Sequence, residues 1–109
     1  MKITVTEANN YSILDLEGRI DVTGSPQLEN EVTRRIDAGK NRLVFDCSGV
    51  DYISSSGLRV FLFTQKVLTR SSGKLHVCCM KSEIRDIFEM TGLLGLFSVF
   101  ETREEALNS

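Results

Sequence analysis

Three consecutive serines, Ser54, Ser55 and Ser56, precede Gly57 at the start of a strongly apolar segment with helical spacing. A serine hydroxyl at the N-terminus of a helix accepts a hydrogen bond from backbone N–H groups that have no partner in the first turn. The same end of a helix carries the positive pole of the helix dipole, which favours an anion such as a phosphate. The serine cluster is therefore either a helix cap or the place of a phosphate group, and capping chemistry alone does not separate the two.

Other reactive side chains do not form a catalytic pattern. His76 is the only histidine and falls inside an expected strand, and Cys47 beside Asp46 has no identifiable base. The serines lack the Gly-x-Ser-x-Gly elbow of hydrolases, and the sequence has no Walker-type glycine-rich phosphate loop. Since an enzyme needs a nucleophile, a base and an oxyanion site that converge, we expect a binding module that is not an enzyme, with no cofactor and no metal.

Length and composition predict one soluble globular domain spanning residues 1–109, with 41% hydrophobic and 26% charged residues. The net charge of -2 argues against a nucleic-acid partner, because no basic excess is available to neutralise phosphates. No apolar run has the length of a membrane span, and the sequence MKITVTEANN lacks the features of a signal peptide. The three cysteines, two of them adjacent, suit neither a disulfide framework nor a zinc site. We therefore expect buried thiols and a cytoplasmic location.

Two strands are expected before the first helix. Polar and apolar residues alternate over residues 2–7, and a second apolar run covers residues 11–16. Asn9-Asn10 between them is a turn signal, so the chain should open with a β-hairpin. Gly18 and the run 21–24 are expected to end the second strand.

The first helix is expected to begin at Ser25-Pro26, with the serine as N-cap and the proline as first helical residue. Leu28, Val32 and Ile36 recur at four-residue spacing and form its buried stripe, and Gly39 ends it.

The second half of the chain alternates strands and helices. We expect a short buried strand at 43–46, a loop at 47–54 and a central helix from the serines to about Arg70. A strand at 74–80, a helix capped by Ser82, a short strand at 98–100 and a helix from Thr102 follow. Alternating strands and helices imply parallel pairing through right-handed crossovers. The predicted fold is α/β: a mixed five-stranded sheet with about four helices and an opening hairpin.

One side of the central helix is expected to face away from the core. At 100° per residue, the outward side carries Ser55, Ser56, Arg59, Phe63, Lys66 and Arg70, opposite a side with Leu58, Phe61, Leu62, Gln65 and Leu68. This outward side is either an ordinary solvated face with one half-covered aromatic ring or a docking face for an acidic partner. Arginine and aromatic side chains are typical of interface centres.

Residues 47–58, with the sequence CSGVDYISSSGL, resemble the signature of STAS domains and most closely that of bacterial anti-sigma factor antagonists. Residues 16–21 followed by the Ser-Pro helix resemble the second strand and first crossover of that family. Residues 88–93 and 100–107 resemble its C-terminal third, so that the resemblance spans nearly the whole chain. It implies the single-domain STAS-like fold.

The resemblance also implies a phosphorylation-controlled binding module whose phosphoacceptor is Ser55. The implied partners are an anti-sigma factor that is also a serine kinase, which the unphosphorylated protein binds to free a sigma factor, and a phosphatase that restores Ser55. The residues expected at the partner interface are Asp21, Ser54, Ser56, Gly57, Arg59, Phe63 and Lys66. Ser54 stands where the family usually has an aspartate, and Arg59 and Phe63 stand at positions that are often small. The alternative function is a STAS scaffold or adaptor that works with a different kinase or phosphatase.

Overall fold

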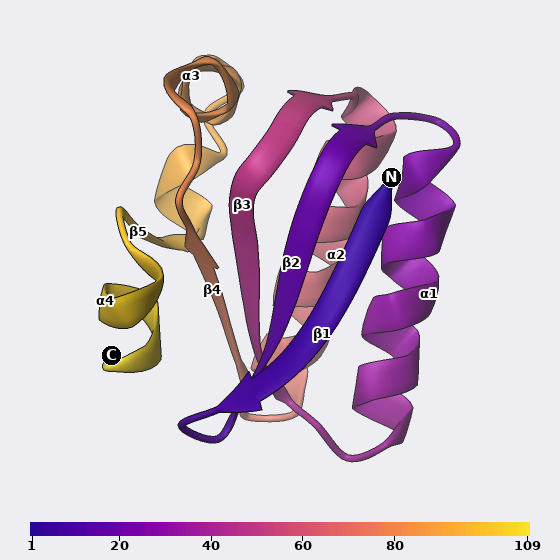
Figure 1. Ribbon diagram of the computed structural model, residues 1–109, viewed down its shortest axis with the longest axis vertical. Coiled ribbons are helices and arrows are strands. Elements are labelled where there is room, and N and C mark those ends of the chain that lie inside the picture. The colour runs from indigo at the N-terminus through magenta and orange to yellow at the C-terminus, as the bar shows by residue number, and fades with distance from the viewer.

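Five strands form one mixed sheet in the computed structural model, which describes residues 1–109. In chain order and in spatial order they are β1 (Lys2–Ala8), β2 (Tyr11–Ile20), β3 (Arg42–Ile53), β4 (Lys74–Cys78) and β5 (Ser98–Phe100). β1 and β2 are antiparallel, whereas β2 through β5 pair in parallel (Figure 1). The predicted α/β class, mixed five-stranded sheet and opening hairpin are confirmed.

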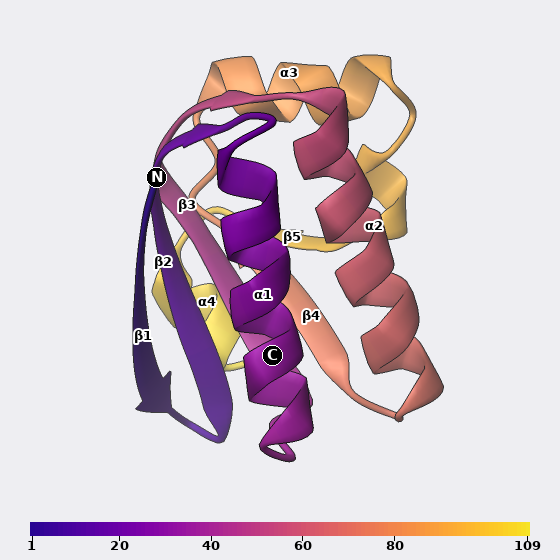
Figure 2. The same ribbon diagram turned by 90° about the vertical axis from the view of Figure 1, so that its right-hand side faces the viewer.

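Four helices surround the sheet: α1 (Gly24–Asp37), α2 (Ser55–Arg70), α3 (Ser82–Met90) and α4 (Arg103–Leu107). A 3-10 turn, η1 (Leu94–Leu96), follows α3. Figure 2 shows α1 and α2 side by side over one face, with α3 across the end of the sheet, and Figure 1 shows α4 on the opposite side from α1. Right-handed crossovers place consecutive helices on the same face, so the first turns of α1 and α2 meet at the carboxyl ends of β2 and β3.

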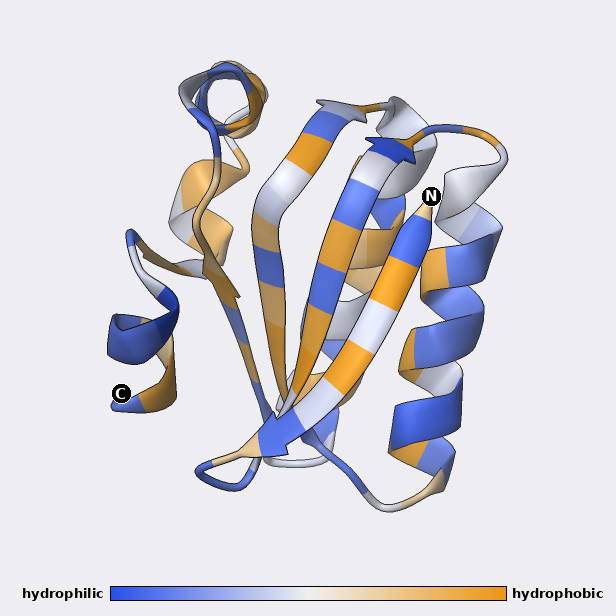
Figure 3. Ribbon diagram, viewed as in Figure 1, coloured by the Kyte–Doolittle hydropathy of each residue, from blue (hydrophilic) through white to orange (hydrophobic).

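The main hydrophobic core lies between the sheet and α1 and α2. Phe61 of α2 is fully buried in it, and its ring centroid lies 4.9 Å from that of Phe45, 5.4 Å from that of Phe88 and 6.2 Å from that of Phe97. A smaller cluster, which includes Tyr11, lies beneath α4 on the other face. Figure 3 shows the alternation of apolar and polar residues along β1 that this two-faced arrangement requires. None of the helices has both the length and the apolar character needed to cross a lipid bilayer.

The loop expected at residues 47–54 is instead mostly strand, because β3 continues to Ile53 beside a β2 that continues to Ile20. Register shifts in the β2–β3 pair break the period-2 pattern by which a strand is recognised in the sequence. Gly49 packs so closely against β2 that a Cβ atom there would lie 2.9 Å from the carbonyl oxygen of Leu16. Gly18 does not end β2 but lies at one of the shifts with a φ of +102°.

The expected start of α1 also needs correction. The helix begins at Gly24, and Ser25 lies inside its first turn with Pro26 behind it. The carboxylate of Asp21 accepts the hydrogen bonds of the Thr23 and Gly24 amides, at 3.1 and 2.8 Å. Asp21 thus takes over the role that the sequence pattern assigned to Ser25.

Two further boundaries differ from the sequence prediction. β4 ends at Cys78 and not at Met80, because Cys79 adopts a positive φ of 62° that leaves the extended conformation. Lys81, not Ser82, is the N-cap residue of α3, and the Ser82 hydroxyl donates to the carboxylate of Glu83.

His76 of β4 is a packing residue, buried between the rings of Tyr11 and Phe100 with centroid distances of 5.1 and 4.8 Å. Its Nδ1 lies 2.7 Å from the carbonyl oxygen of Ala106 and so holds α4 against the sheet. Burial lowers the pKa of His76 below its ordinary 6.5, and the nearby cations Lys74 and Arg42 act in the same direction against the Ala106 carbonyl.

We therefore expect the free energy of unfolding to fall as the pH drops from 7.5 to 5. The unfolded chain takes up a proton near pH 6.5 that the folded protein resists, so this contribution is complete above that pH and is lost below it. A single site changes stability by at most about 1.4 kcal/mol per pH unit. Urea unfolding at several pH values should show that the free energy of unfolding changes less steeply with pH in His76→Gln than in the wild type. An equal pH dependence of the unfolding free energy in both proteins would exclude His76 as the titrating group.

Candidate protein-docking site

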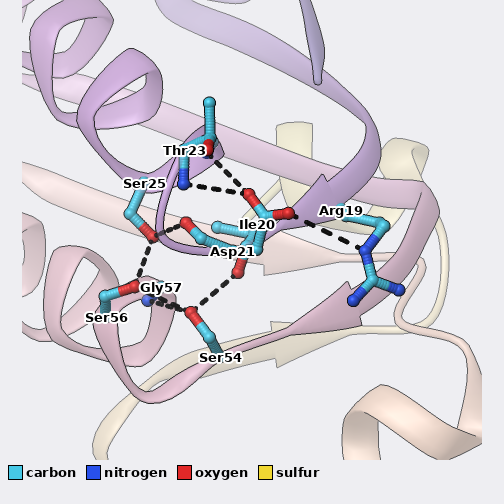
Figure 4. Close-up of polar contacts among 9 residues, drawn as sticks. Arg19, Ile20, Asp21, Thr23, Ser25, Ser54, Ser56 and Gly57 are labelled. Carbon is cyan, nitrogen blue, oxygen red and sulfur yellow. Dashed lines mark hydrogen bonds and ion pairs between the residues drawn. The ribbon is translucent and has the colours of Figure 1, made fainter.

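The predicted site forms where the carboxyl ends of β2 and β3 meet the first turns of α1 and α2 (Figure 4). The Ser54 hydroxyl donates to the Ile20 carbonyl at 3.1 Å and accepts from the Gly57 amide at 3.2 Å, so Ser54 is the N-cap of α2. The Ser56 hydroxyl lies 2.7 Å from that of Ser54 and 3.0 Å from that of Ser25. This chain of hydroxyls joins the start of α2 to β2 and to α1.

The hydroxyl chain is closed at both ends by backbone carbonyls. The Ser25 hydroxyl donates to the carbonyl oxygen of Asp21 at 2.7 Å, and Ser54 donates to that of Ile20 at the other end. Each serine hydroxyl carries one proton, so the three serines donate at most three hydrogen bonds at a time over these four contacts. Ser54 and Ser56 are therefore committed to interactions within the protein.

Ser55 differs from both neighbouring serines. It is the first residue of α2, its side chain is exposed, and its hydroxyl makes no hydrogen bond within the protein. The first-turn amides of α2 have no intrahelical acceptor, so the surroundings of this hydroxyl favour negative charge. Of the three serines, Ser55 is the most exposed and the only one whose hydroxyl is free of hydrogen bonds within the protein.

Gly57 brings the first turn of α2 against both strands. A Cβ atom at this position would lie 2.8 Å from side-chain carbons of Ile20 and Ile53 and 2.9 Å from the Ile20 carbonyl oxygen. Glycine is therefore required at this position for close packing.

We expect Gly57→Ala to lower the free energy of unfolding by about 1–3 kcal/mol, the usual range for an overpacked site. The added methyl group would clash with the Ile20 backbone as well as with side chains, and the clash would push α2 away from β2. Gly95→Ala is the matched control, because a Cβ there meets nothing within 4 Å, and it should change stability by less than about 0.5 kcal/mol. Urea denaturation measures both, and equal stabilities of the two variants would contradict the packing argument.

Asp21 lies in the connection from β2 to α1 and shapes that turn. The Gly24 amide is the main cause that lowers the pKa of Asp21, followed by the Thr23 amide, with the Arg19 guanidinium 3.8 Å away as a smaller contribution. The carboxylate is therefore ionised at neutral pH and fixes the start of α1. Val22, next to it, is 79% exposed.

The outward side of α2 is exposed as predicted. Arg59, Phe63, Lys66 and Arg70 all point away from the core, and Phe63 is 39% exposed. A shallow groove of about 240 Å³ runs from this side to the start of α1, and its lining includes Val22, Pro26, Glu29, Ser56 and Arg59. The sequence placed Ser25 at the start of the first helix but did not indicate that Ser25 or Val22 belongs to this site. The only signal for Val22 is an apolar residue in a polar turn.

A second group of reactive side chains lies elsewhere, beneath α4. Asp46, Cys78 and Cys79 offer atoms within 4.8 Å of one another. Burial alone would raise the pKa of Asp46, but hydrogen bonds from Ser48 and Arg103 outweigh it and hold the pKa below its ordinary value. Burial raises the pKa of the Cys78 thiol, so that it is not a nucleophile at neutral pH.

This group is a structural anchor for α4. Arg103 donates from Nε to Asp46 at 2.9 Å and also pairs with Asp15, so one guanidinium joins β2, β3 and α4. Cys47 and Cys78 are fully buried, as the sequence predicted, while Cys79 is partly exposed.

Comparisons with known proteins point to one family. The sequence profile of the STAS domain matches residues 2–106. The chain is 39% identical over 106 residues to BtrV of Bordetella bronchiseptica, provisionally assigned as an anti-sigma factor antagonist; the match covers 97% of this chain and 91% of BtrV. It is 29% identical over 104 residues to the anti-sigma-B factor antagonist of Staphylococcus aureus, covering 95% and 96% of the two chains.

The structure agrees with this assignment. A crystal structure of an anti-sigma factor antagonist from Mycobacterium paratuberculosis superposes with a TM-score of 0.88 at 26% identity, covering 98% of this chain and 91% of that one. These relatives are named for antagonising another protein, which is a binding function and not an enzymatic one. The signature around the serines, the fold and the full-length matches agree, and the chain belongs to the STAS domain family.

Proposed function

We propose that this protein is an anti-sigma factor antagonist whose binding is switched by phosphorylation of Ser55. The unmodified protein binds an anti-sigma factor and thereby frees a sigma factor for transcription. The anti-sigma factor is also a serine kinase that phosphorylates Ser55, and a protein serine phosphatase reverses the modification. The names of the relatives support the antagonist role, and the serine cluster supports the switch.

One observation carries the assignment of Ser55. Its hydroxyl is exposed and makes no hydrogen bond within the protein, whereas the hydroxyls of Ser54 and Ser56 are bound within the hydroxyl chain. A kinase must align the acceptor oxygen with the phosphate that it transfers. Ser55 offers that oxygen without disturbing the cap of α2.

The phosphate would act on the docking surface and not on the fold. A phosphoserine adds about -1.5 to -2 charges, and the N-terminus of a helix accommodates such an anion. A partner that approaches this end closely would meet a bulky and strongly solvated group. A loss of about 1.4 kcal/mol already lowers affinity tenfold, so a single phosphate is sufficient for a switch.

The same surface supplies the remaining contacts with the partner. Arg59, Phe63 and Lys66 lie exposed along α2 beyond Ser55 and suit an acidic partner surface with an apolar contact at the ring. Ser54, Ser56 and Gly57 hold the start of α2 in place, and Asp21 holds the start of α1 beside it.

The proposal is tested by incubating the protein with ATP and purified anti-sigma factor kinases of the same cell, and then mapping the modified residue by mass spectrometry. We expect one phosphate on Ser55, none on Ser55→Ala and one on the control Ser56→Ala. Modification of Ser54 or Ser56, or none by a kinase that binds the protein, would overturn the switch. Binding only to some other kinase or phosphatase would instead support the scaffold alternative.

A further inference from the structure

Arg59 follows Ser55 by four residues and lies on the same side of α2. In an α-helix this spacing corresponds to a rise of about 6 Å and places the two side chains next to each other. Both are exposed, and the Arg59 guanidinium makes no ion pair or hydrogen bond within the protein. It is therefore a cation without a partner beside the proposed phosphoacceptor.

Two other cations at this end of the molecule, Arg19 and Lys81, are already engaged. The Arg19 guanidinium stacks 4.1 Å from the centroid of the Tyr52 ring and lies 3.8 Å from the Asp21 carboxylate. Lys81 forms an ion pair with Asp51 at 2.6 Å. Lys66, the next exposed cation on α2 after Arg59, lies about 16 Å along the helix axis from Ser55, which is beyond the reach of its side chain.

The carboxylates near Arg59 do not form ion pairs with it. Glu29 of α1 lines the same groove but forms no ion pair with Arg59. The Asp21 carboxylate is held by the Thr23 and Gly24 amides and by Arg19. A new dianion one helical turn away would therefore be the strongest acceptor that Arg59 could reach, since hydrogen bonds between ionised groups are the strong ones.

We infer that a phosphate on Ser55 is held by the guanidinium of Arg59. The inference rests on the proposed phosphorylation of Ser55 and describes how the same site is regulated. Arg59 is one of the cations offered to an acidic partner, so phosphorylation has two effects on docking. It adds an anion to the surface and withdraws a cation from it. The pair also lies within one helix, which orders the phosphate without any movement of the fold.

The phosphate's own titration tests the pairing. Phosphoserine is placed at position 55 by genetic incorporation, so neither kinase nor partner is needed, and its second pKa is measured by ³¹P NMR. Arg59 favours the dianion, so Arg59→Gln should raise this pKa by at least about 0.2 pH unit, the size of one exposed pair at four-residue spacing. The matched control Lys66→Gln should leave it unchanged. Since the pair is exposed, the difference should shrink in 1 M salt.

A second readout on the same samples follows the arginine itself. On phosphorylation the Nε–H proton signal of Arg59 should move downfield, as expected for a proton donated to a phosphate oxygen. Equal phosphate pKa values in wild type and Arg59→Gln, with an unmoved Arg59 signal, would overturn the inference. That result would leave the proposed function intact, because the function fails on a different measurement, namely equal partner affinity of the phosphorylated and unmodified proteins.

Discussion

We expect Ser55→Asp to bind the anti-sigma factor at least about tenfold more weakly than the wild type, and Ser55→Ala to keep wild-type affinity. The aspartate puts a permanent negative charge in place of the one hydroxyl of the cluster that faces solvent without an internal partner. Opposite an acidic partner, that charge is repelled or left poorly solvated. Alanine removes only a hydroxyl that makes no hydrogen bond within the protein. Isothermal titration calorimetry measures all three affinities.

Ser109→Asp is the control for added charge. It adds the same unit of charge at the exposed C-terminus, beyond α4 and on the far side of the sheet from α1 and α2 (Figure 1). This variant should bind like the wild type. Ser55→Asp is shorter and less charged than phosphoserine and reaches Arg59 less well, so its effect should be smaller than that of the phosphate. If Ser55→Asp, Ser55→Ala and wild type bound equally, Ser55 would have no part in recognition.

The largest effect on stability is expected from Phe61→Ala. Phe61 is fully buried and packs against the rings of Phe45, Phe88 and Phe97, so it joins α2 to β3, α3 and the segment before β5. Removing such a ring costs about 3–5 kcal/mol through lost burial and the cavity left behind. That is a large part of the about 5–15 kcal/mol by which a domain is stable. Urea unfolding should show a much lower midpoint.

Phe63→Ala provides a matched comparison on the same helix. Its ring is 39% exposed on the outward side of α2, so its truncation should change the free energy of unfolding by less than about 1 kcal/mol. Its effect should appear in partner affinity, since aromatic anchors contribute strongly to interfaces. Similar losses of stability in both variants would contradict the assignment of one ring to the core and the other to the docking face.

Features set by local chemistry could be predicted from the sequence. The span of α2 from the serines to Arg70 follows from helical periodicity and is confirmed. The hairpin turn at Asn9 and Asn10 is confirmed, with φ values of 52° and 68°, because asparagine tolerates the positive φ that such turns need. The helix expected from Thr102 is confirmed as α4, and Thr102 is its N-cap, in a capping box with Glu105.

Features set by distant parts of the chain could not. The extension of β3 depends on its register against β2, and the contact of Ser56 with Ser25 joins residues 31 positions apart. Periodicity placed Arg59 and Phe63 on the outward side but did not show that Val60 and Thr64 belong to the buried side. The separate roles of the three serines likewise depend on the Ile20 carbonyl, which only the folded sheet brings to the start of α2.

The most direct test of the switch compares the unmodified protein with the protein phosphorylated on Ser55, by calorimetric titration into the same anti-sigma factor. We predict tight binding of the unmodified protein and a loss of more than about tenfold on phosphorylation, larger than that of Ser55→Asp. Thermal unfolding of both forms should show that the fold is retained. Equal affinity of the two forms for an anti-sigma factor that binds the protein would contradict the switch.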